Sequence, residues 1–336
     1  MELSNIYLKL ENLQPSGSFK SRGIGNFMLQ KLKGLVSQET GPGERALDHV
    51  HFYSSSGGNA GLACVHAAVT LGCRASVIVP LTTTSYMIAK LREAGAAEVI
   101  QHGASWQEAD QFLTGVVMAQ AQEHGETAIY VPPFDAPEIW AGNSLLVHES
   151  VQQLDSAARH YQDFNEASSG ASQKTIDSFI CSVGGGGLFC GVMQGIDELG
   201  LRNTRVAVVE TQGADSLAQS VAKKELVTLP AITSIATSLG ARTVCKQALE
   251  YGMRSQVSTV VLTDSEALQA CRRLANEERL LVEPACGASV ALCYGGQLSS
   301  LIPDLTQASV VVVVLCGGSN VSLDILAKYA DESNLV

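Results

Sequence analysis

The stretch Ser178–Leu188, with the sequence SFICSVGGGGL, joins a mostly apolar run to four consecutive glycines. An apolar run without regular alternation is typical of a β-strand that is covered on both faces, as in a parallel sheet. The glycines that follow predict a tight turn, and the apolar residues after them predict a helix. This strand–turn–helix order is the repeating unit of α/β folds.

The same alternation continues in both directions along the chain. Short runs rich in β-branched residues predict further strands at His51–Ser54, Ser76–Pro80, Arg205–Glu210, Ser258–Leu262 and Ser309–Cys316. Longer stretches between them predict helices at Asn59–Leu71, Ser85–Gly95, Ser105–His124 and Ser265–Glu278. Val36–Asp48 and Asp163–Thr175 lack periodicity and predict loops. The sequence therefore predicts an α/β fold built on parallel sheets.

Composition and charge exclude several classes of protein. The chain has 336 residues, of which 46% are hydrophobic and 16% charged, enough for two folded domains or one domain with a large insertion. Its formal net charge of -11 comes without a basic run, so we expect no nucleic-acid partner. The apolar run Val310–Cys316 is long enough only for a buried strand, and we expect no membrane partner.

The nine cysteines show neither a Cys-x-x-Cys pair nor a Cys/His cluster at zinc spacing. Their scatter among apolar residues indicates reduced thiols, as in a cytoplasmic protein.

The four glycines after Val183 offer a backbone cradle for a phosphate group. They do not form a dinucleotide fingerprint, because Phe189 and Cys190 stand where a third glycine would be required. They do not form a P-loop either, since no Gly-Lys-Ser/Thr follows. A second turn, Ser54–Gly61 (SSSGGNAG), ends a strand and opens a helix, where free N–H groups suit a carboxylate. A helix cap without a ligand remains the alternative there.

Two further elements complete a set of reactive groups. Lys20 lies in the turn Pro15–Gly23 (PSGSFKSRG), and a lysine beside a phosphate site can bond covalently to a carbonyl group if burial lowers its pKa. Taken alone, it equally suits an exposed loop. Cys316 follows the most hydrophobic strand, at the end where parallel sheets bind ligands, although a cysteine there can also serve only as packing. Lysine, phosphate cradle, carboxylate turn and thiol together meet the needs of pyridoxal-phosphate (PLP) chemistry.

On the motifs Pro15–Gly23, Ser54–Gly61, Gly184–Leu188, Glu210-Thr211 and Cys316–Gly318, the chain resembles the fold-type II PLP enzymes, which have the tryptophan synthase β-like fold. Within them it is most similar to the serine/threonine dehydratases, in particular the eukaryotic L-serine dehydratase branch. The resemblance covers nearly the whole chain and implies two α/β domains with parallel sheets. These are a large PLP-binding domain of residues 1–26 plus 143–336 and a small inserted domain of residues 27–142. The branch normally has a further strand and a Thr-Pro-Leu stretch before Ile6–Asn12. The shorter start here is expected to affect folding yield and dimer packing more than chemistry.

The resemblance also implies the roles of cofactor-binding residues. Lys20 would bond covalently to the cofactor, and Phe19 would stack on its ring. Cys316, followed by Gly317, would face the ring nitrogen. Backbone N–H groups would hold the phosphate at Gly184, Gly185, Gly186, Gly187 and Leu188.

Further roles concern the substrate and a cation. Asn59 would hydrogen-bond the phenolic oxygen of the cofactor and, with Ser56 and Gly57, the substrate carboxylate. Phe134 would line the substrate pocket. A potassium ion would bind Glu210 and carbonyl groups of Gly184, Ala214, Ser238, Leu239 and Ala241. Because an unpaired carboxylate is costly in a buried strand, a salt bridge from Glu210 to a nearby basic residue is the alternative.

The expected activity is elimination of water and ammonia from L-serine, and also from L-threonine, by a cytoplasmic homodimer active in amino-acid catabolism and gluconeogenesis. A thiol facing the ring nitrogen favours elimination over transamination. The alternatives are a serine racemase, a β-replacing fold-type II enzyme, or an inactive PLP-binding paralogue. Serine racemases that resemble this chain have a serine at the position of Gly57, which acts on the second face of the substrate. Glycine cannot do this, and we expect it to leave the substrate additional room.

Overall fold

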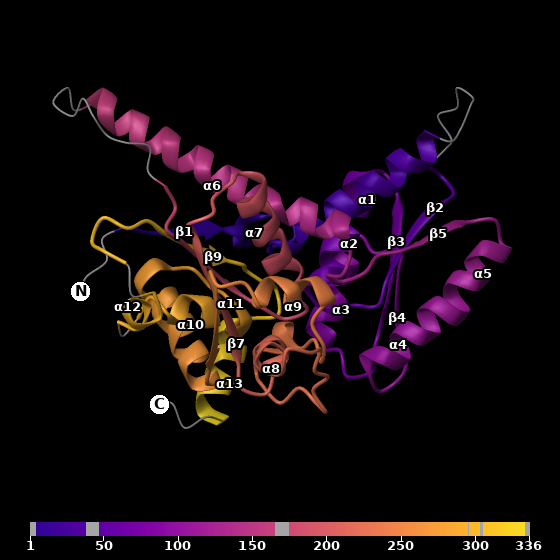
Figure 1. Cartoon of the computed structure of the whole chain (residues 1–336). Coiled ribbons are helices and arrows are strands. Elements are labelled where there is room, and N and C mark those ends of the chain that lie inside the picture. Colours follow the sequence, from indigo (N-terminus) through magenta and orange to yellow (C-terminus); the bar gives the residue numbers. More distant parts are fainter. Residues whose placement is uncertain (1–4, 38–46, 165–174, 295, 303–304, 333–336) are drawn as a thin grey trace. The chain divides into compact units, whose positions relative to one another are not determined.

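The computed structural model describes residues 5–37, 47–164, 175–294, 296–302 and 305–332 (Figure 1). The two predicted loops, 36–48 and 163–175, fall mainly outside these ranges. The described part of the chain is an α/β protein with two separate sheets, one of five strands and one of four. Contacts divide it into two compact units, which are described separately below.

The five-strand unit comprises the described residues within 1–12, 143–317 and 321–336. The four-strand unit comprises 13–142 and 318–320. Residues 13–26 thus group with the smaller unit, whereas the sequence-based division placed them in the larger domain. The reason lies in α1(Lys20–Val36), which is one continuous helix packed against α2(Asn59–Thr70) of the same unit. A boundary at Phe27 would cut this helix.

The sheet of the five-strand unit is parallel throughout. Its order is β1(Ile6–Leu10), β9(Val311–Leu315), β6(Ser178–Ser182), β7(Arg205–Thr211) and β8(Val257–Leu262). The central strands β9 and β6 are buried at every residue, and they pair in register with Val313 opposite Ile180. This burial matches the apolar runs that predicted these strands, because a parallel sheet is covered on both faces.

Helices follow β6, β7, β8 and β9 of this sheet, whereas α6(Pro137–Phe164) precedes β6 and its residues 137–142 group with the other unit. The helices that follow these strands are α7(Gly187–Glu198), α8(Ser216–Lys223), η3(Thr237–Leu239), α9(Lys246–Gly252), α10(Asp264–Glu278), α11(Pro284–Ala291), α12(Gln297–Leu301) and α13(Leu323–Glu332). Helix α11 packs on β6, β7 and β9, and α10 packs on α11. The start of α10 is fixed by a capping box, in which Thr263 and Glu266 bond each other's backbone N–H groups.

The four-strand unit also has a wholly parallel sheet. Its order is β4(Glu98–Gln101), β3(Arg74–Val79), β2(Val50–Ser54) and β5(Thr127–Tyr130). Beside α1 and α2 it contains α3(Ser85–Glu93), α4(Trp106–Phe112), the π-helical turn η2(Leu113–Val117) and α5(Met118–Glu123). The short η1(Glu11–Leu13) spans the division between the units, which falls after Asn12. The predicted helix Ser105–His124 is therefore helical almost throughout but passes through a π turn.

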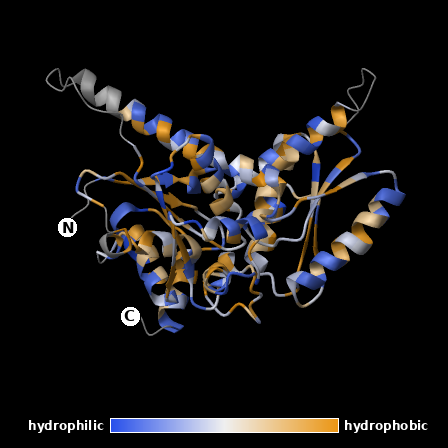
Figure 2. Cartoon of the chain, in the orientation of Figure 1, coloured by the Kyte–Doolittle hydropathy of each residue, from blue (hydrophilic) through white to orange (hydrophobic). Residues whose placement is uncertain are grey.

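Alternate residues of β2 face two different cores. Val50 and Phe52 pack with residues of α1 and α2, whereas Tyr53 packs with Ala109 and Leu113. The helices are amphipathic to match, and both hydrophobic and hydrophilic residues occur along α1 and α6 in Figure 2.

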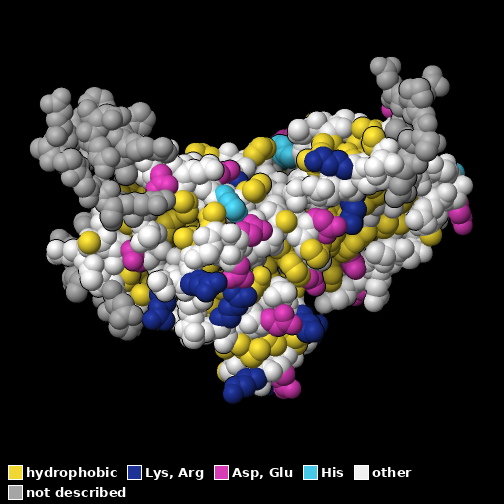
Figure 3. Space-filling view, turned by 45° about the horizontal axis from the view of Figure 1, so that its top comes forward, with side chains coloured by type: hydrophobic (Ala, Val, Ile, Leu, Met, Phe, Trp, Pro, Cys, Tyr) yellow, Lys and Arg dark blue, Asp and Glu magenta, His cyan; other side chains and the backbone are white. Residues whose placement is uncertain are grey.

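On the face shown in Figure 3, acidic and basic side chains are interspersed. Within the described ranges, every helix is too short or too polar to cross a lipid bilayer.

Candidate active site

The four-glycine turn lies at the carboxyl end of β6, in the middle of the five-stranded sheet. Gly186 has a φ of 96°, and a Cβ there would lie 2.5 Å from the Cβ of Ala248. A Cβ on Gly184 would lie 3.0 Å from the backbone of Leu239. A side chain is excluded at Gly186 and would be tightly packed at Gly184, so the turn itself presents only backbone. Because α7 begins at Gly187, the unbonded N–H groups of its first turn belong to this cradle, which suits a phosphate.

The carbonyl groups of the cradle are held from outside. The backbone N–H of Cys245 donates to the carbonyl of Gly185 at 3.0 Å. The side-chain amide of Asn143 donates to the carbonyl of Gly187 at 2.9 Å. These two bonds fix the orientation of the peptide groups of the cradle. Because its carbonyl groups are engaged by other donors, an anion in the cradle would contact N–H groups.

Cys316 lies beside the cradle, since β9 and β6 are neighbours in the sheet. Its thiol is 5% exposed and lies 3.5 Å from the hydroxyl of Ser182, the last residue of β6. A hydrogen bond also joins it to Cys286, and burial together with that bond raises the pKa of the Cys286 thiol well above its ordinary value. Gly317 follows with a φ of 80°. The structure therefore brings Cys316, Gly317 and the cradle together.

Glu210 is completely buried near the end of β7. Among the described residues it makes no salt bridge. Instead its carboxylate accepts backbone hydrogen bonds from Leu217 and Ala218, at 2.8 and 2.7 Å, in the first turn of α8. Burial raises the pKa of Glu210 to about 8, against the effect of these two bonds. The helix start thus satisfies part of the carboxylate, as negative groups are favoured there.

Other residues expected around a cation gather in the same unit. A Cβ on Gly184 would lie 3.1 Å from the carbonyl oxygen of Ser238, so the cradle touches the turn η3. The hydroxyl of Ser216 donates to the carbonyl of Ala241 at 3.1 Å, beside the α8 turn that holds Glu210. Ala214 and Leu239 belong to one buried cluster.

Lys20 is the first residue of α1 in the four-strand unit, and its side chain is partly buried. Its Nζ donates a short hydrogen bond to the carbonyl of Pro133 and lies 5.2 Å from the centre of the Phe19 ring. The next residue of that segment, Phe134, accepts a bond from the indole of Trp140 at 3.0 Å. The structure thus places the predicted lysine, its aromatic neighbour and the predicted pocket residue together.

The carboxylate turn ends β2, in the interior of the four-stranded sheet. Ser56 Oγ accepts a bond from the N–H of Gly58 at 3.3 Å, and α2 begins at Asn59. A Cβ on Gly61 would lie 1.9 Å from the carbonyl oxygen of Ser56, so glycine is required for the helix to start this close to the turn. The acceptor end of the Asn59 amide bonds the N–H of Ser319 at 2.8 Å. A hydrogen bond to the phenolic oxygen of the cofactor would be donated by the other end of this amide, Nδ2.

The additional room expected at Gly57 is absent, and that expectation was wrong. A Cβ at this position would lie 2.8 Å from both γ atoms of Thr83 and 3.2 Å from Val79. The backbone conformation of Gly57 would permit a side chain, because its φ is not positive. Thr83 therefore fills the space beside Gly57, which sequence reasoning missed.

Asp110 and Tyr130 were also missed. Asp110 accepts a hydrogen bond from Ser55, which is 55 residues away in the chain, and another from Tyr130, which is 20 residues further on. Neither residue belongs to a recognisable motif, and no local signal in the sequence connects them to the turn.

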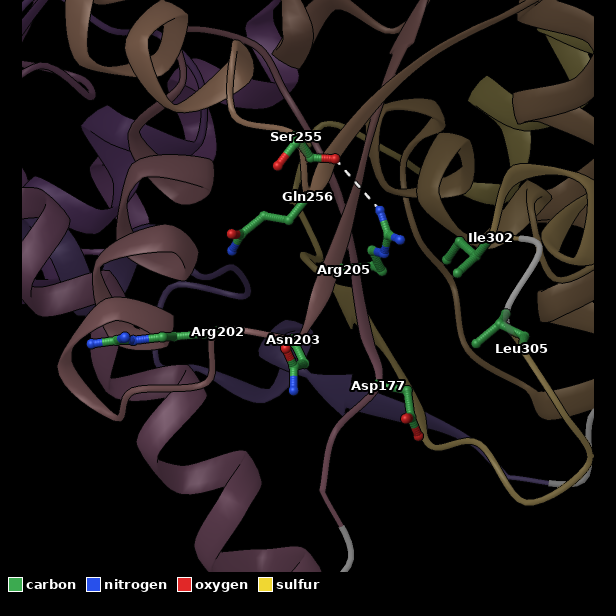
Figure 4. A pocket seen from close by; sticks show the side chains of 8 residues that line it. All are labelled: Asp177, Arg202, Asn203, Arg205, Ser255, Gln256, Ile302 and Leu305. Carbon is green, nitrogen blue, oxygen red and sulfur yellow. Dashed lines mark hydrogen bonds between the residues drawn. The ribbon is translucent and has the colours of Figure 1, made fainter.

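A pocket of about 500 Å³ in the five-strand unit lies at the opposite end of the sheet (Figure 4). Asp177 directly precedes β6, Arg205 begins β7 and Gln256 directly precedes β8, so the pocket is at the amino ends of the strands. Its full lining is Asp177, Arg202, Asn203, Arg205, Ser255, Gln256, Ile302 and Leu305. The cradle and Cys316 lie at the carboxyl ends, so this pocket is separate from them.

Two parallel sheets, a glycine cradle that excludes side chains and a lysine at the start of a helix define a fold-type II PLP enzyme. The cradle fits the phosphate of the cofactor, because a Cβ would fill it and its donors belong to a helix start.

Comparison with known proteins agrees with this class. The model of the pyridoxal-phosphate dependent enzyme family matches residues 2–317, and the chain therefore belongs to that family. It is 39% identical to an L-serine dehydratase of Saccharomyces cerevisiae over 98% of this chain and 93% of the yeast protein. It is 38% identical to an L-serine dehydratase/L-threonine deaminase of Bos taurus, over 95% and 88% of the two chains. The crystal structure of a fungal L-serine ammonia-lyase from Rhizomucor miehei superimposes with a TM-score of 0.80 at 32% identity, covering 98% and 93%.

Proposed function

We propose that this enzyme eliminates water and ammonia from L-serine to give pyruvate, and acts on L-threonine to give 2-oxobutanoate. The observation that carries the proposal is the buried thiol of Cys316, held by Ser182 directly beside the phosphate cradle. The L-serine dehydratase relatives, which match along almost the whole chain, support it.

Lys20 has the central role in this proposal. Its Nζ would hold the cofactor covalently in the absence of substrate, and with substrate bound Nζ is the base that takes the proton from Cα. The cofactor, when bound, supplies a sink for the electron pair that remains at Cα. The bond from Nζ to the Pro133 carbonyl orients the amine, because a donor bonded in this way has its direction fixed. The β-hydroxyl leaves as water with an added proton, for which Lys20 is one source, and the released aminoacrylate hydrolyses to pyruvate and ammonia.

Cys316 favours this outcome over competing reactions. A thiol would stabilise positive charge on the ring of a bound cofactor less than a carboxylate would, which would favour loss of the β-group over competing reactions. The substrate carboxylate is received by Ser56, Gly57 and Asn59 at the start of α2, where N–H groups and the helix dipole favour an anion. Gly57 lacks any group that could exchange a proton with Cα, and Thr83 fills the space beside it.

The test is an absorption spectrum of the purified protein together with a pyruvate assay on L-serine. We expect visible absorption from bound cofactor, release of pyruvate, and little D-serine by chiral chromatography. Lys20→Ala should abolish both absorption and activity, and borohydride reduction of the wild type should leave the pyridoxyl group on Lys20. A pyridoxyl group on another lysine, or D-serine formed as fast as pyruvate, would overturn the proposal.

We also propose that Glu210 and the carbonyl groups of Gly184, Ala214, Ser238, Leu239 and Ala241 hold a potassium ion. The buried Glu210 supports this, because burial raises its pKa to about 8 despite two backbone hydrogen bonds, and a cation would offset the remaining cost of a buried carboxylate. Activity should be higher in potassium than in tetramethylammonium at equal ionic strength. Equal activity in the two buffers contradicts a cation at this site.

The assembly and location of the enzyme are further proposals, which the resemblance to the L-serine dehydratase branch supports. We propose a cytoplasmic homodimer that acts in amino-acid catabolism and gluconeogenesis. Sedimentation of the purified protein and fractionation of cells test the first two points.

A further inference from the structure

Three elements of the four-strand unit meet at the side chain of Asp110. Its Oδ1 accepts a hydrogen bond from the hydroxyl of Ser55 at 2.6 Å and a second from the hydroxyl of Tyr130 at 2.7 Å. Ser55 follows the end of β2, Asp110 lies on α4, and Tyr130 ends β5. Ser55 is 1% exposed, and the other two side chains are partly buried. Both bonds have the short length typical of a hydroxyl donating to a carboxylate.

These two bonds are shorter than the side-chain hydrogen bonds within the turn that follows. Within the turn, the N–H of Ser56 reaches the hydroxyl of Ser54 at 3.5 Å, and the N–H of Gly58 reaches that of Ser56 at 3.3 Å. Both distances exceed the usual range for N–H donors, so these local bonds restrain the backbone weakly. Burial raises the pKa of Tyr130, so its hydroxyl remains a donor to Asp110 at physiological pH.

We propose that Asp110, together with Tyr130, is a positioning residue that holds Ser55 and thereby keeps the backbone of Ser56 and Gly57 in place for the substrate carboxylate. This rests on the proposed function, which places the carboxylate at that turn. Asp110 itself touches neither substrate nor cofactor in this proposal. The group recognised is the α-carboxylate that L-serine and L-threonine share, so the two substrates are affected alike.

The test begins with Asp110→Ala in the cofactor-loaded enzyme. Hydrogen bonds to a charged group contribute enough that KM for L-serine should rise roughly ten-fold or more, while kcat falls less than about three-fold. KM for L-threonine should rise by the same factor, and cofactor content should be unchanged. Asp110→Asn keeps an acceptor oxygen and should recover most of the loss. Tyr130→Phe and Ser55→Ala each remove one donor and should raise KM by smaller factors. These milder variants test the role of Asp110 if Asp110→Ala does not fold.

Glu126→Gln is the matched control. Glu126 is also a carboxylate that accepts a bond from a tyrosine of this sheet, Tyr53, at 2.9 Å, and it accepts another from Arg74 at 2.7 Å. It makes no contact with the turn among the described residues. KM should therefore stay within about two-fold of wild type in this variant, as expected for substitutions remote from a site.

Hydrogen exchange gives a reading that does not depend on turnover. In Asp110→Ala, amides of residues 55–59 should exchange faster, while those of the cradle at 184–188 should be unchanged. If the wild type releases no pyruvate, the proposed function fails, and exchange at 55–59 still decides whether Asp110 holds the turn. Unchanged exchange there overturns the proposal. So does an equal fall of kcat/KM in Asp110→Ala and Glu126→Gln, which would indicate general loss of stability.

Discussion

The four-glycine turn after Val183 and the turn Ser54–Gly61 lie in equivalent places but are held in different ways. Each follows an interior strand of its own parallel sheet and begins a helix, β6 to α7 in one unit and β2 to α2 in the other. At Gly186 the backbone has a positive φ and lies against Ala248, so only glycine fits. At Gly57 the obstacle is the end of the Thr83 side chain, and the turn is restrained by side-chain hydroxyl groups and Asp110. A positive φ and the fixed Cβ of Ala248 specify the first turn, whereas side chains that can rotate specify the second.

The difference has a consequence for mutation. The first turn should fail when a side chain is added, because the Cβ of Ala248 has no rotatable bond by which it could move away. A turn specified by side chains can be altered and then restored by a second substitution in the partner. Three experiments, ordered by the size of the expected effect, test this contrast.

Gly186→Ala should give the largest effect. The added Cβ meets Ala248 at 2.5 Å, and the positive φ is strained for alanine. Displacement of the cradle by about 1 Å should reduce activity on the order of 100-fold, with weaker retention of cofactor on dialysis. Gly200→Ala is the control, since Gly200 has a φ of 65° but nothing within 4 Å of its Cβ position. It should cost about 1 kcal/mol of stability and leave cofactor retention unchanged. Equal loss of cofactor in both variants would show that strain alone, not packing at the cradle, is responsible.

Gly57→Ala should give an intermediate effect that can be reversed. Thr83 must rotate to admit the new methyl group, at a cost of about 0.5–1.5 kcal/mol, or roughly two- to ten-fold in kcat/KM for L-serine. Adding Thr83→Ala removes both γ atoms and should restore most of the activity. A Gly57→Ala variant that is more active than wild type would show that the space beside Gly57 is open to the substrate after all.

The smallest effect should come from protonation of His51 at low pH. His51 lies on β2, the strand that precedes the turn Ser54–Gly61. Burial is the main cause that lowers the pKa of His51, and its ring nitrogens lie 3.0 Å from Glu126 and 2.9 Å from Ser76. Because the folded pKa is below the unfolded value of about 6.5, the contribution of neutral His51 to stability is complete above that pH and is lost as the pH falls through the folded pKa.

Exchange of the β2 amides, corrected for intrinsic rates, should therefore rise modestly between pH 7.5 and pH 5.5, while the cradle changes little. His51→Gln should flatten this dependence. If the pH dependence of exchange persists unchanged in His51→Gln, another group causes it. His66 on α2 is one such group, since burial also lowers its pKa.

The same contrast explains what the sequence could predict. Contiguous residues form the cradle and the strands at 178–182, 205–211 and 311–315, so local sequence patterns could predict them. The structure confirms the predicted parallel sheets. The edge strands β4 and β5 were not predicted, because each has four residues that are at most partly buried. Thr83, Asp110 and Tyr130 reach the second turn only through tertiary packing, and no local pattern indicates them. The roles of Lys20, Asn59 and Cys316 toward a cofactor stay predictions.

The pairing of β1 with β9 has a consequence for synthesis of the chain. Residues 6–10 leave the ribosome early, but their partner strand, residues 311–315, follows roughly 300 residues later, or about 15–60 s at usual rates of translation. All four strands of the smaller sheet lie between Val50 and Tyr130 and emerge long before that. Meanwhile β6, which is apolar and pairs with β9 in the finished protein, presents an unpaired edge, and such edges promote aggregation. Slow expression at low temperature, or additional chaperone, should therefore raise the yield of folded enzyme by protecting this one strand.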